Sequence, residues 1–260
     1  MSNTTLITDI HTHVLPGIDD GPTDLEEATQ LLEAIRNTGV NRVFCTSHYA
    51  SPNFPVTTDD LMVAYSSLLP RQDLANWPGL SFAAEVRLSP GLETDLRNRS
   101  IPTLGSTRYV LIEFPGNDIS EANLSLIHEL SVRGYLPIMA HPERNLSVQR
   151  RPEWLEDLQE LGIHFQLTAD CFLKSSSDML NRDKLAWKIL EHGQATLVAS
   201  DTHNISSRAP VLVQAYERIG LKLGQNIVDQ LVENSNYVWD NAEIHPVSAA
   251  KPRKRVLGLF

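Results

Sequence analysis

The stretch Tyr109–Ala140, YVLIEFPGNDISEANLSLIHELSVRGYLPIMA, carries the pattern on which the fold prediction rests. An apolar run at Tyr109–Phe114 is followed by helical spacing over Ser120–Arg133, which ends at Gly134, and by a second apolar run at Leu136–Ala140. Short apolar runs are typical of buried strands, and a helical connection makes two neighbouring strands parallel. The stretch therefore predicts one strand–helix–strand unit.

The same alternation extends in both directions along the chain. Further strands are predicted at Leu6–Ile10, Arg42–Thr46, Ser81–Ala84, His164–Leu167 and Thr196–Ser200, and further helices at Leu25–Thr38, Leu61–Leu69, Glu153–Leu161, Asp178–His192, Pro210–Ile219 and Gln225–Val232. Thr23 and Glu26 have the spacing of a capping box at the start of the first helix. About seven strand–helix units predict an α/β barrel of the TIM type or a distorted relative, with an open doubly wound sheet as the alternative.

The composition limits the possible domain organisation and the possible binding partners. The 260 residues are 42% hydrophobic, which suits a single domain, and we expect residues 1–248 to form it. Residues 249–260 carry Lys251, Arg253, Lys254 and Arg255, and we expect a loosely ordered basic tail. The net charge of −10 argues against nucleic acid as a partner, and the lack of a long apolar run argues against membrane insertion. The oligomeric state stays open and includes a homo-oligomer.

Cysteine usage indicates the compartment. Cys45 and Cys171 have no partner at metal-binding or disulfide-framework spacing, which is typical of a protein from the reducing cytoplasm. Neither cysteine is followed six residues later by an arginine, because Ser51 and Ser177 stand at those positions, so neither has the spacing of a cysteine nucleophile that works with an arginine. Both cysteines are therefore expected to be core residues.

Residues that commonly bind metal ions follow the predicted strands. They are His11, His13, His48, Glu85, Glu113, His141, Asp201 and His203. In a parallel barrel these strand ends meet on one face, where active sites lie. One such residue alone is usually a cap or a satisfied polar group, but burying the whole set without cations would be very costly. The pattern predicts a polynuclear metal site.

The ligand types limit the metal. Imidazole and carboxylate groups without thiolate suit Mn, Fe or Zn and disfavour a cysteine-based structural zinc site. Asp19 and Asp20, in the segment GIDDGP, are ordinary turn formers that could also supply a ligand at this face. Arg144, in HPER, and Arg208, in DTHNISSR, lie on loops at the same face, where guanidinium groups can bind phosphate. For a single arginine a salt bridge within the loops is the ordinary explanation, whereas two arginines favour phosphate binding.

Several motifs together resemble a known family. DIHTHVLPGIDDGP, TSHY, AEV, LIEF, AHPER and ASDTH occur in this order between Asp9 and His203. This set is similar to the polymerase-and-histidinol-phosphatase (PHP) superfamily and, within it, to the bacterial manganese-dependent protein tyrosine phosphatases of capsule and exopolysaccharide operons. The resemblance covers roughly Asp9–Val238 and implies a distorted (β/α)7 barrel with three divalent metal ions, manganese first and iron or zinc as alternatives.

The resemblance also implies roles for individual residues. The first ion is expected on His11, His13, Glu85 and Asp201, the second on Glu85, Glu113 and His141, and the third on Asp20, His48 and His203. Arg144 and Arg208 match phosphate-contacting arginines, and Asp201 is a further catalytic candidate as a proton acceptor. The sequence departs from the relatives at Arg87–Leu88, where aromatic residues are frequent, and at Tyr49–Ala50, where basic residues are frequent. Arg87 is expected to be a solvated arginine at the rim, with a contribution to phosphate affinity as the alternative.

The resemblance implies in-line attack on phosphorus by a metal-bound hydroxide, with phosphotyrosine on the tail of a bacterial tyrosine kinase as the substrate. The nearest rival is a PHP phosphoesterase for a small phosphomonoester such as histidinol phosphate. A non-catalytic regulator that binds the phosphotyrosine tail is a rival from another class. A deacetylase or amidohydrolase would leave both arginines unexplained.

Overall fold

The predicted strand–helix–strand unit is present in the computed structural model, which describes residues 6–72, 76–89, 91–98, 100–115 and 118–250. Strand β6 (Tyr109–Glu113) leads to helix α4 (Glu121–Val132), and strand β7 (Leu136–Ala140) pairs with β6 in parallel register. Ser120 caps α4, because its hydroxyl accepts a hydrogen bond from the Asn123 N–H while the Asn123 side chain accepts one from the Ser120 N–H. Gly134, at φ 86°, then lets the chain leave the helix.

The described strands form a closed ring. They are β1 (Thr8–Thr12), β2 (Arg42–Cys45), β3 (His48–Tyr49), β4 (Gly79–Phe82), β5 (Glu85–Arg87), β6, β7, β8 (His164–Thr168) and β9 (Leu197–Ala199). All neighbouring pairs are parallel, and the orders β1-β2-β4 and β3-β5-β6-β7-β8-β9 describe the two sheets. A parallel bridge between Thr12 and Thr202 joins β9 to β1, so the doubly wound alternative is wrong.

Two positions of the ring are broken strands. β2 continues as β3 after Thr46 and Ser47, and β4 continues as β5 after Ala83 and Ala84. Counted as single positions, they give seven around the ring, in agreement with the expected distorted (β/α)7 barrel. The second halves of the two strands pair with His48 opposite Glu85, which places both side chains at the same height.

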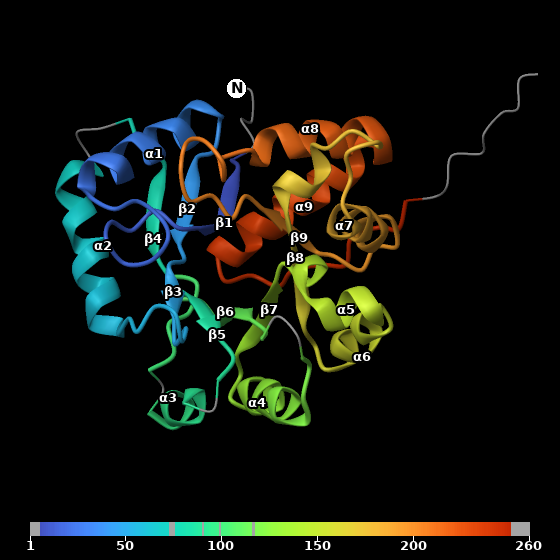
Figure 1. Cartoon of the computed structure of the whole chain (residues 1–260), viewed down its shortest axis with the longest axis horizontal. Helices are drawn as coiled ribbons and strands as arrows, with labels where there is room; N and C mark the ends of the chain where they lie inside the picture. Colours follow the sequence, from blue (N-terminus) through green and yellow to red (C-terminus); the bar gives the residue numbers. More distant parts are fainter. Residues whose placement is uncertain (1–5, 73–75, 90, 99, 116–117, 251–260) are drawn as a thin grey trace, which may run out of the picture.

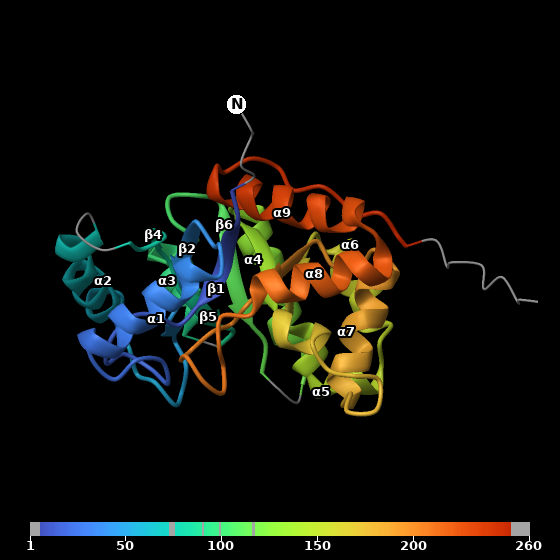
Figure 2. The same cartoon turned by 90° about the horizontal axis from the view of Figure 1, so that it is seen from above.

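Helices surround the strands, as both views show (Figures 1 and 2). Besides α4 they are α1 (Leu25–Asn37), α2 (Thr58–Gln72), α3 (Leu92–Asn98), α5 (Leu146–Arg150), α6 (Trp154–Glu160), α7 (Asn181–Glu191), α8 (Leu212–Leu223) and α9 (Gln225–Trp239), with short 3₁₀ helices η1 (Pro142–Arg144) and η2 (Ala169–Phe172). Alternate side chains of β6 belong to two different hydrophobic clusters. Tyr109 and Leu111 join a small cluster inside the barrel, whereas Val110 and Ile112 join the larger cluster under the helices.

Some boundaries differ from the sequence predictions. The first strand is not Leu6–Ile10 but Thr8–Thr12, since hydrogen bonding to the next strand continues through the polar residues. The capping box of Thr23 and Glu26 is wrong: Asp24 caps α1 by accepting hydrogen bonds from the backbone N–H groups of Glu26 and Glu27. Helix α9 runs to Trp239 rather than to Val232.

Two further expectations concern the C-terminal tail and the possibility of a membrane-spanning helix. Residues 251–260 lie outside the described part of the chain, so the division at residue 248 stays a prediction. The last described residue, Ala250, donates its N–H to the carbonyl of Glu191 at the end of α7. Among the described helices, none is both long and apolar enough to cross a lipid bilayer.

Candidate metal and phosphate site

The histidines of the first strand face each other across a short gap. The Nδ1 of His11 lies 2.8 Å from Oε1 of Gln166, and the Nδ1 of His13 lies 2.8 Å from Oδ2 of Asp19. Since these oxygens accept hydrogen bonds, each Nδ1 carries the proton and each Nε2 presents a lone pair. The two Nε2 atoms are only 3.1 Å apart, so a cation or a proton must lie between them.

Two buried carboxylates complete this position. Oε2 of Glu85 lies 3.6 Å and 3.5 Å from the Nε2 atoms of His11 and His13, and Oδ1 of Asp201 lies 3.4 Å and 3.6 Å from them. Glu85 is 1% exposed and Asp201 is 2% exposed. The register of β1 against β2 shifts between Asp9 and Thr12, so the regular strand pairing is interrupted at His11.

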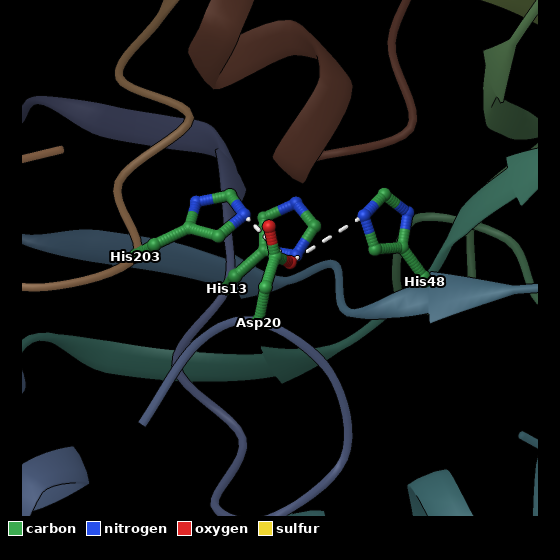
Figure 3. A group of neighbouring side chains, drawn as sticks. All are labelled: His13, Asp20, His48 and His203. Atoms are coloured by element: carbon green, nitrogen blue, oxygen red, sulfur yellow. Dashed lines mark ion pairs between the residues drawn. The ribbon is translucent and has the colours of Figure 1, made fainter. Parts of the chain in front are cut away.

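Asp20 lies between two further histidines (Figure 3). Its Oδ1 is 3.1 Å from Nε2 of His203 and 3.6 Å from Nε2 of His48. The Nδ1 of His203 lies 3.0 Å from the backbone carbonyl of Asp201, which directs its Nε2 toward Asp20. The His13 ring stacks on the His203 ring with centroids 3.8 Å apart, so this position adjoins the first one.

Glu85 also connects the other side of the site. Its Oε1 lies 2.8 Å from Nε2 of His141, and its Oε2 lies 3.0 Å from Nδ1 of His48. Glu113, at the end of β6, joins His48 and Glu85 in one group of potential ligands. Arg87 corrects the expectation of a solvated rim residue, because its Nη1 lies 2.7 Å from Oε2 of Glu113.

The structure brings all nine predicted ligands together. Their potential ligand atoms form four groups within 4.8 Å, namely His13, Asp20, His48 and His203; His11, His13 and Asp201; His11, Glu85 and His141; and His48, Glu85 and Glu113. The groups with Asp20 and with Asp201 follow the sequence prediction closely. The predicted set of Glu85, Glu113 and His141 is divided between two groups. The assignment of each ligand to an ion stays a prediction.

The donor set fits divalent cations. Two buried ring nitrogens, Nδ1 of His48 and Nε2 of His203, have no hydrogen-bond partner within the described residues, although both lie next to carboxylates. A metal ion would use these lone pairs. The set contains imidazole and carboxylate but no thiolate, in keeping with Mn, Fe or Zn. The buried Cys45 and Cys171 are free and lie outside the four groups, as expected for core residues.

The pKa values of the buried histidines and carboxylates show that this site requires positive charge. Burial would lower the pKa of His13, but the neighbouring Asp19 and Glu85 raise it to about 10. Burial would raise the pKa of Glu85, but His11, His13 and His141 hold it well below its usual range. Burial and the charge of His13 lower the pKa of His203 to about 4. A proton thus holds His13 beside the carboxylates when no metal ion is bound.

Both predicted phosphate-binding arginines converge on Asp201. Nη1 of Arg144 lies 2.7 Å from Oδ2 of Asp201, and Nη2 of Arg208 lies 2.8 Å from the same oxygen. Arg208 also reaches Asp20, with Nη1 3.0 Å from Oδ2. The two guanidinium groups line a cavity of about 220 Å³ together with His48, Glu85, Glu113, His141 and Asp201. Cationic forks and metal-ligand candidates therefore share one cavity.

Two site residues have an unusual backbone. His141 has φ 35° and Asp201 has φ 53°, in the left-handed region that favours glycine. His141 follows β7 directly, and Asp201 follows β9 after Ser200. Such conformations cost about 1–3 kcal/mol each and are typical of functional sites. The turns direct these side chains into the cavity.

Two supporting residues, Gln166 and Phe54, were not predicted, and Asp19, which was considered as a turn former or a ligand, lies outside the four groups. Gln166 on β8 orients His11, and Asp19 orients His13 while also accepting from the N–H of His48. The Phe54 ring stacks on His48 at 5.1 Å between centroids. The doublet Asp19–Asp20 offered a signal for Asp19, but nothing distinguished Gln166 from an ordinary buried amide. His128, His164, His192 and His245 lie outside the four groups, as their positions in the sequence suggested.

Known proteins are similar to this chain over almost its whole length. The tyrosine-protein phosphatase YwqE of Bacillus subtilis (strain 168) is 29% identical over 259 residues, covering 97% of this chain and 99% of that protein. The tyrosine-protein phosphatase CpsB of Streptococcus agalactiae serotype III (strain NEM316) is 29% identical over 239 residues, covering 90% of this chain and 98% of that protein.

Solved structures are similar to this chain in fold. A chain from the crystal structures of YwqE from Bacillus subtilis and CpsB from Streptococcus pneumoniae, described as unique metal-dependent tyrosine phosphatases, superposes with a TM-score of 0.86 at 27% identity, covering 96% of this chain and 100% of that chain. The phosphotriesterase from Mycobacterium tuberculosis, with a TM-score of 0.50 and 12% identity over 91% of this chain and 94% of that one, shares the fold alone. The profile of the family "Capsular polysaccharide synthesis, CpsB/CapC" matches residues 7–239. The chain therefore belongs to the CpsB/CapC family.

Proposed function

We propose that this chain is a metal-dependent protein-tyrosine phosphatase. The observation that carries the proposal is the shared cavity, where candidate ligands lie opposite the guanidinium groups of Arg144 and Arg208. Relatives named tyrosine-protein phosphatases align over almost the whole chain. A phosphate group needs this combination, because its charge must be balanced inside a low-dielectric cavity.

The proposed cofactor is three divalent cations, with manganese first and iron or zinc as alternatives. His11, His13, Glu85, Glu113, His141, Asp201, Asp20, His48 and His203 would hold them. When bound, such ions lower the pKa of a coordinated water and neutralise the charge that develops on the oxygens around phosphorus. The nearly complete burial of His11, His13 and Glu85 keeps bulk water from competing for these groups.

The chain's own residues then act on the phosphoryl group. Arg144 and Arg208 would each bind its oxygens through their paired N–H groups, and Asp201 orients both guanidinium groups. Burial would raise the pKa of Asp201, but His11 and the two arginines lower it far below its usual range, which makes this carboxylate a weak base. We therefore assign Asp201 mainly as a ligand and an orienting residue, and its role as a proton acceptor stays a prediction.

The proposed substrate is phosphotyrosine on the tail of a bacterial tyrosine kinase that serves polysaccharide export, so that dephosphorylation regulates capsule or exopolysaccharide synthesis. A tyrosine leaving group has a pKa of about 10 and departs without a strong general acid. The family's connection to capsular polysaccharide synthesis supports this substrate. The free, buried Cys45 and Cys171 are compatible with the cytoplasm, where we place the protein.

The decisive experiment combines metal analysis of the purified protein with hydrolysis of a phosphotyrosyl peptide and of histidinol phosphate. We expect bound manganese or iron, faster turnover of the peptide, loss of activity with EDTA, and no loss after thiol alkylation. Faster turnover of histidinol phosphate would favour the small-substrate phosphoesterase instead. Peptide binding without turnover would favour a non-catalytic regulator.

Variants connect this activity to the cavity. Arg144→Lys and Arg208→Lys keep the charge but lose the paired N–H donors, and we expect kcat to fall about 10²–10³-fold in each. Arg218→Lys on α8 is the matched control, because Arg218 does not line this cavity. Full activity of folded His141→Ala or Asp201→Ala would contradict the assignment of the site.

A further inference from the structure

A second and larger cavity lies between α5, α6 and α7, on the side of the barrel where these helices pack (Figure 1). Its volume is about 570 Å³, compared with about 220 Å³ for the active-site cavity. Leu146 and Leu185 supply apolar surface above the buried Leu155 and Ile189. Arg150, Lys184 and Lys188 supply positive charge. None of the described residues that line it is an aspartate or a glutamate.

The positive charges of this cavity have no internal partners. Within the described part of the chain, the side chains of Arg150, Lys184 and Lys188 form no ion pair, and all three are exposed. Lys184 and Lys188 are also one helical turn apart on α7, a spacing at which like charges repel and disfavour the helix. A protein with a net charge of −10 thus keeps three unpaired cations together at one cavity.

The second cavity adjoins the first one along the chain. Asn145 lines the active-site cavity, and Leu146, the next residue, lines the second one. Asn145 is fixed, because its side chain caps α5 and donates a hydrogen bond to the carbonyl of Pro115. Leu146 is 38% exposed at this junction. A chain bound at the active site would therefore meet the second cavity directly beside it.

We propose that this second cavity binds an acidic segment of the phosphoprotein substrate that also carries apolar side chains. The inference rests on the proposed phosphatase function and assigns a site for recognition outside the phosphotyrosine itself. Carboxylates of the segment would pair with Arg150, Lys184 and Lys188, and its apolar side chains would cover Leu146 and Leu185. The chain's own last ten residues carry Lys251, Arg253, Lys254 and Arg255, so like charge argues against them as the occupant.

The geometry sets the length of this segment. From Asn181 to His192, the wall formed by α7 extends about 17 Å at a rise of about 1.5 Å per residue. An extended peptide covers this distance with about five residues, at about 3.3 Å each. Substrate peptides therefore need a flank of roughly eight residues, which includes a few to pass Leu146.

The test compares the metal-loaded enzyme on two phosphotyrosyl peptides with eight-residue flanks. One flank alternates Glu and Leu, and the other alternates Gln and Leu; each flank is placed before or after the phosphotyrosine. We expect the acidic flank on one side to lower KM about five- to tenfold at unchanged kcat, with the gain lost at high salt. Lys184→Glu/Lys188→Glu should abolish the gain and Lys184→Gln/Lys188→Gln should reduce it, while hydrolysis of free phosphotyrosine stays unchanged.

Arg36→Glu/Arg71→Glu, on α1 and α2, is the matched control and should keep the full gain. Equal KM values for the two flanks, or an undiminished gain in the Lys184→Glu/Lys188→Glu variant, would overturn this inference while free phosphotyrosine hydrolysis still supported the phosphatase. No hydrolysis of any phosphotyrosine compound would overturn both. A change of sedimentation coefficient on charge reversal would instead identify the second cavity as a contact between copies of the chain.

Discussion

In both His11 and His13, a hydrogen bond at Nδ1 fixes the direction in which Nε2 of the same ring points. Gln166 and Asp19 hold the two Nδ1 atoms, so the two Nε2 lone pairs meet at 3.1 Å. We therefore expect the metal affinity of this protein to depend on Gln166 and Asp19, which lie outside the four groups of potential ligands. Such outer partners are known to affect metal affinity strongly.

Replacement of Asp19 tests this dependence. Asp19→Ala frees the His13 ring to rotate and to change tautomer, and we expect the affinity for Mn²⁺ to fall about 10–100-fold. Isothermal titration of the metal-free protein measures the change. Asp59→Ala is the control, because Asp59 lies on α2 away from the site. Equal affinities of the two variants would show that the Asp19 contact is dispensable.

The buried carboxyl group of Asp9 makes the free energy of unfolding depend on pH. Burial raises its pKa to about 6, although the N–H groups of Ser200 and His11 donate to its Oδ1. The unfolded chain ionises near pH 4 and the folded chain near pH 6, so this group lowers the free energy of unfolding as the pH rises between these values, by up to about 3 kcal/mol.

Asp9→Asn keeps the acceptor oxygen and removes this titration. We expect the metal-free variant to gain stability relative to the native protein from pH 4 to pH 6, and no further change above pH 7. Urea unfolding at a series of pH values in EDTA measures the difference. A difference that does not change with pH would contradict the burial of an ionising Asp9.

At the scale of elements, the sequence identified the strands and their polar ends better than the irregular segments. Eight of the nine ligand candidates were predictable because they lie at or just after the ends of apolar strands, which parallel packing brings together. Asp20 lies in the loop between β1 and α1, and its assignment rested on the family resemblance. The breaks after Cys45 and Phe82 were not predictable, since Thr46, Ser47, Ala83 and Ala84 are all compatible with strands. Gln166 was missed because its partner His11 is 155 residues away in the sequence.

Two short helices and the C-terminal end of α9 were also hard to predict. Helices α3 and α5 have only 7 and 5 residues, too few for a helical pattern of apolar residues. Helix α9 was predicted short because Asn234, Ser235 and Asn236 suggest a turn, yet Asn234 is buried and its side chain donates to the carbonyls of Thr196 and His245. Tertiary hydrogen bonds thus outweighed local preference.

The cap of α1 provides a prediction at this scale. Asp24→Ala removes the acceptor for the N–H groups of Glu26 and Glu27, and we expect a loss of about 1 kcal/mol in the free energy of unfolding. Thr23→Ala should cost less, since Thr23 bonds only the exposed Glu27 side chain. Chemical denaturation of both variants distinguishes them, and a larger loss for Thr23→Ala would restore the original capping box.

For the whole molecule, metal binding is coupled to proton release. The pKa of about 10 for His13 means that this ring holds a proton at neutral pH in the metal-free protein, whereas His203, with a pKa of about 4, does not. A cation at the Nε2 of His13 must displace that proton. The apparent affinity for Mn²⁺ should therefore rise with pH, up to about tenfold per unit for each proton released, until the pH approaches that pKa.

Titration calorimetry in buffers of different ionisation enthalpy counts these protons. We expect at least one proton released at pH 7, and fewer in Asp19→Asn, where His13 loses its charged neighbour. An affinity that is independent of pH between 6 and 9 would show that His13 is already neutral before the metal binds.

The seam between the first and last strands has a consequence for biosynthesis. Thr12 pairs with Thr202, and the N–H of Asp201 donates to the carbonyl of His11. Residues from opposite ends of the barrel must therefore meet before Asp201 reaches the histidine pair. On a ribosome, the first strand emerges long before its neighbour is translated, and pairing between residues so distant along the chain is slow. The two groups of potential ligands that contain Asp201 or His203 can therefore form only after the segment that follows β9 has been translated.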